Sequence, residues 1–284
     1  MASRVAIFSE SDLELPADHH TLTASAGTWD PATGLTYSYA WSADGMVISG
    51  ASGPTFVLTA AQLGKRVTVS VTASAAGYVS ASATSSPSAV VTEQITVATA
   101  PSISGKVVVG QTVTSSPGTW SVFGVSLAYQ WYANGTAVKG ATARTLKVSS
   151  ALVGKKLTVR VTATKVGYLS AVSTSAASAA VSKAASKAAL TVKPKKTTTK
   201  KKVKVTVKVS AAGVSGLTGK VKVTYGKKSV TKTLTAKAKG KVTLKLARLK
   251  KGTVKVKAVY TPTSSAAKAV KKGTSKVVKV KVKK

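Results

Sequence analysis

The sequence predicts an all-β protein built from three tandem β-sandwich domains. Three observations lead to this fold class. Apolar and polar residues alternate with a period of two in many short segments. Glycine-rich turn signals separate these segments. A stretch of about 90 residues is duplicated within the chain. The 284 residues are enough for three sandwiches of roughly 100 residues each.

The duplication is read from landmarks that recur at an almost constant spacing. The landmarks pair Gly27-Thr28-Trp29 with Gly118-Thr119-Trp120, Tyr39-Ala40-Trp41 with Tyr129-Gln130-Trp131, and residues 67–78 with residues 157–168. The chain therefore contains two copies of one domain.

Each copy has the strand and turn pattern of an immunoglobulin-like sandwich. In the first copy Tyr37, Tyr39 and Trp41 fall on one face of a predicted strand. Asp44-Gly45 follows that strand, and Asn134-Gly135 follows its counterpart, as expected for two-residue type I′ hairpins. Because immunoglobulin-like cores are built around a tryptophan on such a strand, we expect Trp41 and Trp131 to be buried.

The third domain is a different sandwich rather than a third copy. It lacks tryptophan and the repeat landmarks, yet valines alternate with lysine or threonine along five segments. A sixth strand is predicted over residues 230–234. The complete prediction is therefore an all-β fold of three tandem immunoglobulin-like β-sandwiches.

The predicted boundaries follow from these patterns. We expect an atypical leader over residues 1–19, repeat 1 over 20–98, repeat 2 over 99–182, a Lys/Thr-rich linker over 183–202 and a Lys-rich immunoglobulin-like domain over 203–284. Residues 12–20 lack the valine run found at the start of repeat 2, so the first strand of repeat 1 is expected to be absent or rewritten. Residues 85–91 are expected to form an edge strand, since they contain Pro87.

The landmarks also carry a family resemblance. Repeat 2 resembles bacterial immunoglobulin-like repeats of actinobacterial secreted and surface proteins, through Gly118-Thr119-Trp120, Tyr129-Gln130-Trp131, Asn134-Gly135, Gly140-Ala141-Thr142, residues 153–156 and Gly167-Tyr168. The third domain resembles another bacterial immunoglobulin-like domain, through residues 218–221, 225–227, 249–253 and Val259-Tyr260. The resemblance implies an extracellular or cell-surface location.

The third domain departs from its family pattern at one turn. That family commonly has an acidic glycine-aspartate turn after the tyrosine, where this chain has residues 261–264, Thr-Pro-Thr-Ser. Because of this departure, the resemblance does not extend to cation binding or an acidic contact at this turn. A signal-peptide core is also missing from the first 20 residues, which suggests that the chain begins inside a longer exported protein or at a mis-set start.

The composition argues against an enzyme, a metal site or a cofactor. Only seven acidic residues, two histidines and no cysteine are present. His19 and His20 are adjacent, so on an extended segment they point to opposite faces and cannot easily bind one metal ion. No Gly-x-Ser-x-Gly motif marks a nucleophile, and no apolar run approaches the length of a transmembrane segment.

Charge is distributed very unevenly. The chain has 43 Lys and Arg against seven Asp and Glu, for a net charge of +36. All seven acids lie within residues 1–93, whereas residues 190–284 carry thirty of the basic residues. Strand alternation turns several lysines of the third domain outward, and we expect these to bind polyanions diffusely: Lys204, Lys208, Lys220, Lys222, Lys255 and Lys257.

The expected partners are anionic cell-envelope polymers or other polyanions rather than a specific nucleic acid. Arg248 is the only arginine of this region, and lysine cannot make the bidentate contacts that read bases. The region's aromatics, Tyr225 and Tyr260, occupy inward-facing strand positions, so they are not expected to stack on bases. The alternative is that lysine only solvates the outer faces and protects the sheet edges from aggregation.

The sequence thus predicts a non-enzymatic spacer or adhesion module of a cell surface or secretome. A second interpretation is the C-terminal accessory region of a secreted hydrolase whose catalytic domain lies upstream. Trp29 and Trp120 follow a turn, which leaves open that they lie near a rim and contact a sugar.

Overall fold

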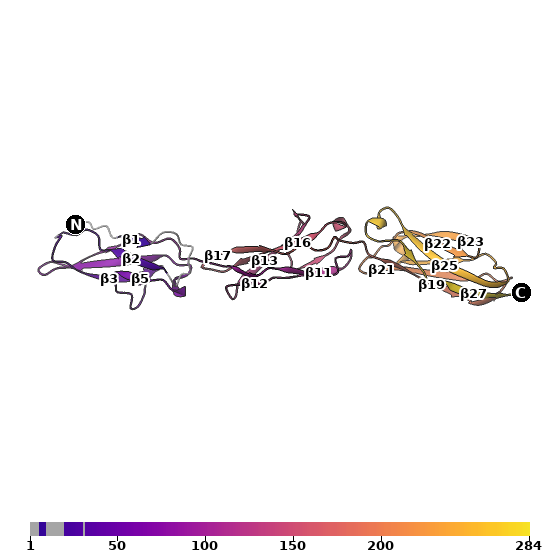
Figure 1. Cartoon of the computed structure of the whole chain (residues 1–284), viewed down its shortest axis with the longest axis horizontal. Helices are drawn as coiled ribbons and strands as arrows, with labels where there is room; N and C mark the ends of the chain where they lie inside the picture. Colours follow the sequence, from indigo (N-terminus) through magenta and orange to yellow (C-terminus); the bar gives the residue numbers. More distant parts are fainter. Residues whose placement is uncertain (1–5, 10–19, 31) are drawn as a thin grey trace. The chain divides into compact units, whose positions relative to one another are not determined.

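The computed structural model describes residues 6–9, 20–30 and 32–284 (Figure 1). Contacts group the chain into two compact units, one holding repeat 1 with residues 118–128 and 161–173, the other holding residues 101–117, 129–160 and 174–284. Strands make up nearly all of the regular structure, and the helices are short 3₁₀ turns. Within the described residues, no helix is long and apolar enough to span a membrane.

Repeat 1 folds into two sheets, with strand orders β1-β2-β5 and β4-β3-β6-β7. Its elements are β1 (Ala6–Ser9), β2 (Thr21–Ser25), β3 (Thr36–Ala43), β4 (Met46–Val47), β5 (Thr55–Val57), the 3₁₀ turn η2 (Ala60–Gln62), β6 (Val67–Ser74) and β7 (Ala81–Thr84). Along β6 every second residue is buried, so Val67, Val69 and Val71 pack against Trp41 in the core. Trp41 is fully buried, and its indole Nε1 donates a 2.9 Å hydrogen bond to the carbonyl oxygen of Gly53.

Repeat 2 has the same strand order, with sheets β10-β11-β15 and β14-β13-β16-β18. Its elements are β10 (Ser102–Gly105), β11 (Thr112–Ser116), β12 (Thr119–Trp120), β13 (Ser126–Ala133), β14 (Thr136–Ala137), β15 (Thr145–Lys147), η3 (Ser150–Leu152), β16 (Leu157–Thr164), β17 (Tyr168–Leu169) and β18 (Ala171–Thr174). Two short sheets pair β12 with β9 (Val97–Thr99) and β17 with β8 (Glu93–Gln94). Trp131 is fully buried, and its Nε1 donates a 2.8 Å hydrogen bond to the Ala143 carbonyl oxygen.

Both predicted hairpins are confirmed. Asp44 and Gly45 have φ angles of 49° and 80°, and Asn134 and Gly135 have the same two values. A type I′ turn requires positive φ at both central residues, which asparagine, aspartate and glycine tolerate. The turns join β3 to β4 and β13 to β14.

The first strand of repeat 1 is present, so of the two alternatives its absence is wrong. β1 lies at residues 6–9, within the expected leader. It pairs antiparallel with β2, with Ala6 opposite Ser25 and Ser9 opposite Leu22. In repeat 2, β10 pairs with β11 in the same manner. The connection between the two strands is longer in repeat 1, over residues 10–20, than in repeat 2, over residues 106–111. At a constant spacing from repeat 2 the strand would fall within residues 12–20, farther along the chain than β1. Most of those residues lie outside the described residues.

The predicted edge strand at residues 85–91 is also corrected. The segment forms no regular strand. It is nevertheless hydrogen-bonded to β6 through serine residues. The Ser85 amide donates to the Val69 carbonyl oxygen at 2.9 Å, and the Ser85 hydroxyl accepts from the Val69 amide at 3.1 Å. Ser175 repeats both contacts with Val159. Side-chain hydroxyls thus replace part of the backbone ladder.

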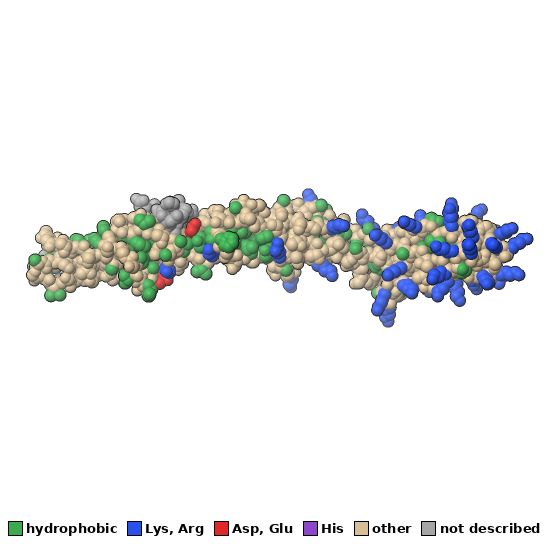
Figure 2. All heavy atoms as spheres, turned by 90° about the horizontal axis from the view of Figure 1, so that it is seen from below, with side chains coloured by type: hydrophobic (Ala, Val, Ile, Leu, Met, Phe, Trp, Pro, Cys, Tyr) green, Lys and Arg blue, Asp and Glu red, His purple; other side chains and the backbone are tan. Residues whose placement is uncertain are grey.

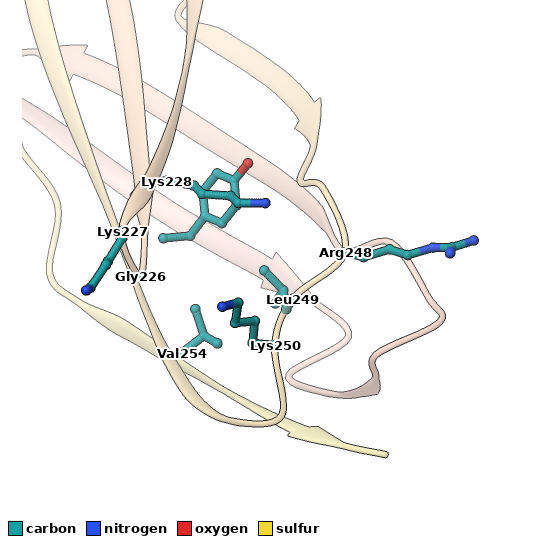
Figure 3. Close-up of a pocket in the computed structure, with 8 residues that line it drawn as sticks. Gly226, Lys227, Lys228, Arg248, Leu249, Lys250 and Val254 are labelled. Atoms are coloured by element: carbon teal, nitrogen blue, oxygen red, sulfur yellow. The ribbon is translucent and has the colours of Figure 1, made fainter.

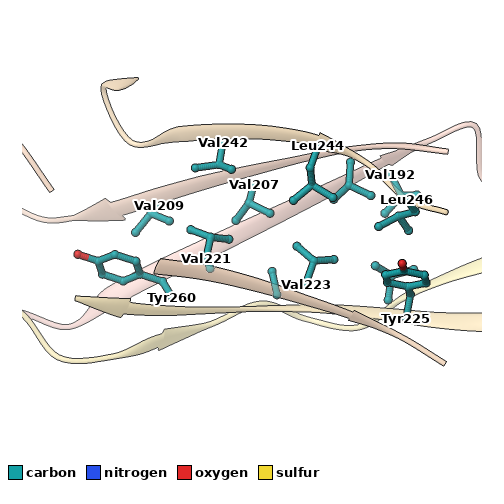
Figure 4. Packing of buried hydrophobic residues seen from close by; sticks show 14 of the residues in the cluster. Val192, Val207, Val209, Val221, Val223, Tyr225, Val242, Leu244, Leu246 and Tyr260 are labelled. Carbon is teal, nitrogen blue, oxygen red and sulfur yellow. The ribbon is translucent and has the colours of Figure 1, made fainter. Parts of the chain in front are cut away.

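The third domain is a sandwich of two sheets, with orders β19-β21-β24 and β20-β27-β25-β22-β23, and β26 pairs with β25. Its elements are β19 (Ser186–Lys193), β20 (Lys196–Thr198), β21 (Lys204–Ala211), β22 (Gly219–Tyr225), β23 (Lys228–Leu234), η4 (Ala236–Ala238), β24 (Lys241–Lys245), β25 (Gly252–Pro262), η5 (Ala266–Lys268), β26 (Gly273–Thr274) and β27 (Val278–Lys283). The alternating valines meet between the sheets, and Tyr225 and Tyr260 lie toward opposite ends of this core (Figure 4). All six predicted strands are present.

The linker predicted over residues 183–202 is wrong, because two strands of the third domain lie within it. β19 pairs with β21 over its whole length, with Ser186 opposite Ala211 at one end and Lys193 opposite Lys204 at the other. β20 pairs parallel with β27. Ala188 and Val192 point into the core and are buried. The segment resembled a linker because small alanines replace the valines that mark the other strands, and because Pro194 interrupts it between the two strands.

With three pairs of packed sheets, the predicted fold class is confirmed. In both repeats the first, second and fifth strands form one sheet, and the third, fourth, sixth and seventh sheet strands form the other. This division is typical of immunoglobulin-like sandwiches.

Candidate functional site: two lysine faces of the third domain

The outer surface of sheet β19-β21-β24 carries three parallel rows of side chains, and we call it the three-stranded face. One row consists of Lys193, Lys204 and Lys245, and another of Ala189, Lys208 and Lys241. Between them lies a row of threonines, Thr191, Thr206 and Thr243. All five lysines are exposed. Neighbouring strands are about 4.8 Å apart and four residues span about 13 Å, so five ammonium groups project from a small area.

Local sequence explains why these lysines point outward. In β21 the inward positions are Val205, Val207 and Val209, all buried, and the residues between them must face solvent. The central threonines of the face approach each other, with 3.4 Å between the hydroxyl oxygens of Thr206 and Thr243. The face therefore has a short polar centre with a row of cations on either side.

The outer surface of the larger sheet, which we call the six-stranded face, carries the second set of lysines. Lys255 lies opposite Lys279, and Lys196 lies opposite Lys281. The remaining lysines are spaced by neutral partners: Lys220 lies opposite Thr261, Lys222 opposite Val259 and Lys257 opposite Thr224. All of these lysines are exposed.

The structure therefore places the six predicted lysines on opposite sides of one sandwich. Lys204 and Lys208 belong to the three-stranded face, and Lys220, Lys222, Lys255 and Lys257 belong to the six-stranded face. They do not form one patch. Their binding to polyanions stays a prediction.

Sequence reasoning missed Lys193, which completes the lysine row with Lys204 and Lys245. It was missed because its strand had been interpreted as a linker. The signal was present, since Ala188, Leu190 and Val192 alternate with Lys187, Thr191 and Lys193. Lys241 and Lys245 also alternate with Val242 and Leu244, as an outward pair should.

No side-chain carboxylate follows Glu93 in the sequence, so no acidic side chain within the third domain can neutralise these cations. Among the hydrogen bonds of the described residues, Lys232 donates its Nζ to the Thr243 carbonyl oxygen at 2.9 Å. Figure 2 shows Lys and Arg side chains projecting densely from the third domain on the surface it displays. The domain must therefore carry a positive potential that attracts anions from solution.

The outward side chains of the two faces are lysines and neutral residues. In the part of the chain that the structure describes, no three His, Asp or Glu residues come together to hold a metal ion. Lysine is a hydrated point charge on a flexible stem, so it neutralises an anion without fixing its geometry.

The tryptophans considered for sugar contact are half-buried. Trp29 donates its Nε1 hydrogen to the Ala26 carbonyl oxygen at 2.6 Å. Trp120 lies on β12, and its Nε1 is buried without a hydrogen-bond partner among the described residues. Neither tryptophan presents a fully exposed ring on which a sugar could stack.

Comparisons with known proteins give structural similarity only. No protein-family profile matches the chain, and no curated protein sequence matches it. Solved structures that it resembles include a tetra-tandem repeat from the extending region of a large adhesion protein, at 14% identity and TM-score 0.40, covering 99% of this chain and 74% of that one. Another comes from a 1.5-MDa bacterial ice-binding adhesin, at 14% identity and TM-score 0.29, covering 98% and 91%.

A third similar structure contains immunoglobulin domains 1–5 of Sidekick-1, at 14% identity and TM-score 0.39. The match covers 99% of this chain but only 59% of the Sidekick-1 chain. At these identities and TM-scores, the similarities carry no functional conclusion for this chain.

Proposed function

We propose that this protein is a non-enzymatic spacer or adhesion module, located on a bacterial cell surface or secreted. In this proposal the third domain associates with anionic polymers of the cell envelope. The immunoglobulin-like repeats supply stable domains, and the lysine faces supply the attraction.

The observation that carries the proposal is the arrangement of cations around a domain without acids. Lys193, Lys204 and Lys245 lie next to one another across three strands, where like charges repel. A bound polyanion relieves that repulsion and releases its own counterions, which gives binding that depends strongly on salt. The six-stranded face adds a second cationic surface on the other side.

The test measures binding of the full-length chain to wall teichoic acid, DNA and a neutral glycan at several salt concentrations. Each phosphate neutralised contributes a slope of about −0.7 to −0.9 to the plot of log affinity against log salt, so about five contacts predict a slope near −4. The neutral glycan should not bind.

Two variants with equal charge loss compare the faces. One carries Lys→Gln at Lys193, Lys204, Lys208 and Lys245, and the other carries Lys→Gln at Lys220, Lys222, Lys255 and Lys257. Each should make the slope about three units shallower if its face holds the polymer. The single substitution Lys204→Gln should weaken binding only slightly. Salt-independent binding, preference for the neutral glycan, or loss of all affinity from Lys204→Gln would contradict the proposal.

Location is tested separately by fractionating the native producer. The proposal expects the chain in the medium or the wall fraction. Recovery in the cytoplasm alone would contradict it.

A further inference from the structure

A hollow of about 370 Å³ lies at one end of the third domain, and none of the lysines named for the two faces lines it. Its walls come from the turn between β22 and β23, from the loop after β24 and from the beginning of β25. The lining residues are Tyr225, Gly226, Lys227, Lys228, Arg248, Leu249, Lys250 and Val254. Its size is near the lower limit for pockets that bind small molecules.

Tyr225 gives this hollow a polar group that the fold does not use. The residue is 7% exposed. Within the described residues its hydroxyl makes no hydrogen bond to protein, and the hydroxyl oxygen is not fully buried. The other core tyrosine behaves differently, because Tyr260 donates its hydroxyl hydrogen to the Thr218 carbonyl oxygen at 2.8 Å. Tyr225 thus lines the hollow and carries a hydroxyl group that the described protein does not bind.

Lysine side chains also line the hollow. Figure 3 shows Lys228 and Lys250 extending toward its interior, whereas Lys227 and Arg248 point away. Leu249 and Val254 supply apolar walls between them. The hollow thus combines two ammonium groups, a phenol hydroxyl and an apolar surface in one concave place.

We propose that this hollow binds one phosphorylated sugar unit. Two ammonium groups and a hydroxyl donor match the oxygens of a phosphate monoester, since charge-assisted hydrogen bonds to phosphate are strong. The apolar walls and the tyrosine ring match the C–H faces of a pyranose. The volume is enough for a single sugar unit. This site is separate from the polyanion faces, so either proposal can fail without the other.

The test titrates the full-length chain with glucose 6-phosphate, glucose and inorganic phosphate at about 0.15 M salt, where diffuse attraction is screened. Selectively ¹³C-labelled tyrosine lets NMR follow the Tyr225 ring directly. We expect saturable shifts of Tyr225 with glucose 6-phosphate and not of Tyr260. Glucose and inorganic phosphate should each bind about tenfold more weakly, because glucose lacks the phosphate group and inorganic phosphate lacks the sugar ring.

Variants separate this site from general charge. The double substitution Lys228→Gln, Lys250→Gln should weaken glucose 6-phosphate about tenfold or more, and Tyr225→Phe about threefold to tenfold. The matched control, Lys208→Gln with Lys241→Gln, removes the same charge from the row of the three-stranded face that lies toward the Tyr260 end of the core, and it should leave affinity within about twofold.

Several outcomes would overturn the proposal. They are equal losses in the pocket and control variants, equal affinity for inorganic phosphate and glucose 6-phosphate, and no saturable binding. A final arm uses a sugar-phosphate polymer and its monomer. If the polymer displaces the monomer, as followed by the Tyr225 signal, the natural ligand is a unit of an envelope polymer. If the polymer does not displace the monomer, the natural ligand is the free sugar phosphate.

Discussion

The hydroxyl of Tyr260 donates a 2.8 Å hydrogen bond to the carbonyl oxygen of Thr218, and its ring covers Gly219. A Cβ atom added to Gly219 would come within 2.6 Å of the Tyr260 ring. The threonine-glycine pair and the distant tyrosine of the third domain are therefore one packing unit. It joins β25 to the start of β22, the central pair of the larger sheet.

The first prediction concerns that hydrogen bond. Tyr260→Phe should destabilise the third domain by about 0.5–1.5 kcal/mol, because this hydrogen bond is lost while the half-buried Thr218 carbonyl oxygen still accepts from the Thr263 amide at 3.1 Å. Tyr225→Phe is the matched control, since the Tyr225 hydroxyl makes no hydrogen bond to the described protein. Urea unfolding followed by NMR signals of β25 measures the difference. Equal effects of the two substitutions would show that the hydrogen bond contributes nothing.

The second prediction concerns pH. Burial raises the pKa of Tyr260 above its ordinary value of 10.0. The folded state therefore favours the neutral phenol, so this stability is complete below the unfolded pKa and is lost as pH rises through the folded pKa.

Unfolding of wild type and Tyr260→Phe is compared from about pH 9 to about pH 11.5, across the range where tyrosine ionises. All other groups are the same in the two proteins, so the difference between them isolates Tyr260. The advantage of wild type over the variant should shrink as pH rises. An advantage that stays constant would contradict the assignment.

Sequence alone predicted the features that rest on strong alternation or on turn chemistry. Trp131 was predicted to be buried because immunoglobulin-like cores are built around a tryptophan on this strand, and it is fully buried. Asn134-Gly135 was predicted to be a hairpin because few residues tolerate two positive φ angles. These signals are local, so one sequence is enough to read them.

The failures occurred where pairing partners are distant or side chains are small. β19 pairs with β21 along eight residues, but its inward residues include Ala188, which gives little hydrophobic contrast. β1 is separated from β2 by a longer connection than in repeat 2, and spacing alone could not locate it. The hollow at Tyr225 was missed because alternation shows that a side chain points inward, not whether its hydroxyl finds a partner.

The third prediction tests the core of repeat 2. Trp131→Ala should destabilise this repeat by about 3–5 kcal/mol, since it removes a large buried side chain and an indole hydrogen bond. Phe123→Ala is the control, because Phe123 is 97% exposed. Differential scanning calorimetry of the full-length chain should show one transition moved strongly by Trp131→Ala and none moved by Phe123→Ala. An unchanged profile for Trp131→Ala would contradict the core assignment.

The fourth prediction concerns repulsion within the three-stranded face. Lys204 lies between Lys193 and Lys245 in the register of the sheet. Lys204→Glu therefore replaces two like-charge pairs with two opposite-charge pairs. Cross-strand charge pairs contribute about 0.2–1 kcal/mol each, so the third domain should gain about 0.5–2 kcal/mol of stability at low salt.

Two controls separate pairing from net charge. Lys257→Glu makes the same charge change, but Lys257 lies opposite Thr224 rather than a lysine, so its gain should be smaller. High salt should reduce both gains, because the Debye length falls from about 10 Å at 0.1 M to about 3 Å at 1 M. Urea unfolding is followed by the NMR signal of Tyr260, which reports on this domain. Equal stabilisation by both substitutions would mean that the net charge of the domain, rather than pairing within the row of Lys193, Lys204 and Lys245, causes the repulsion.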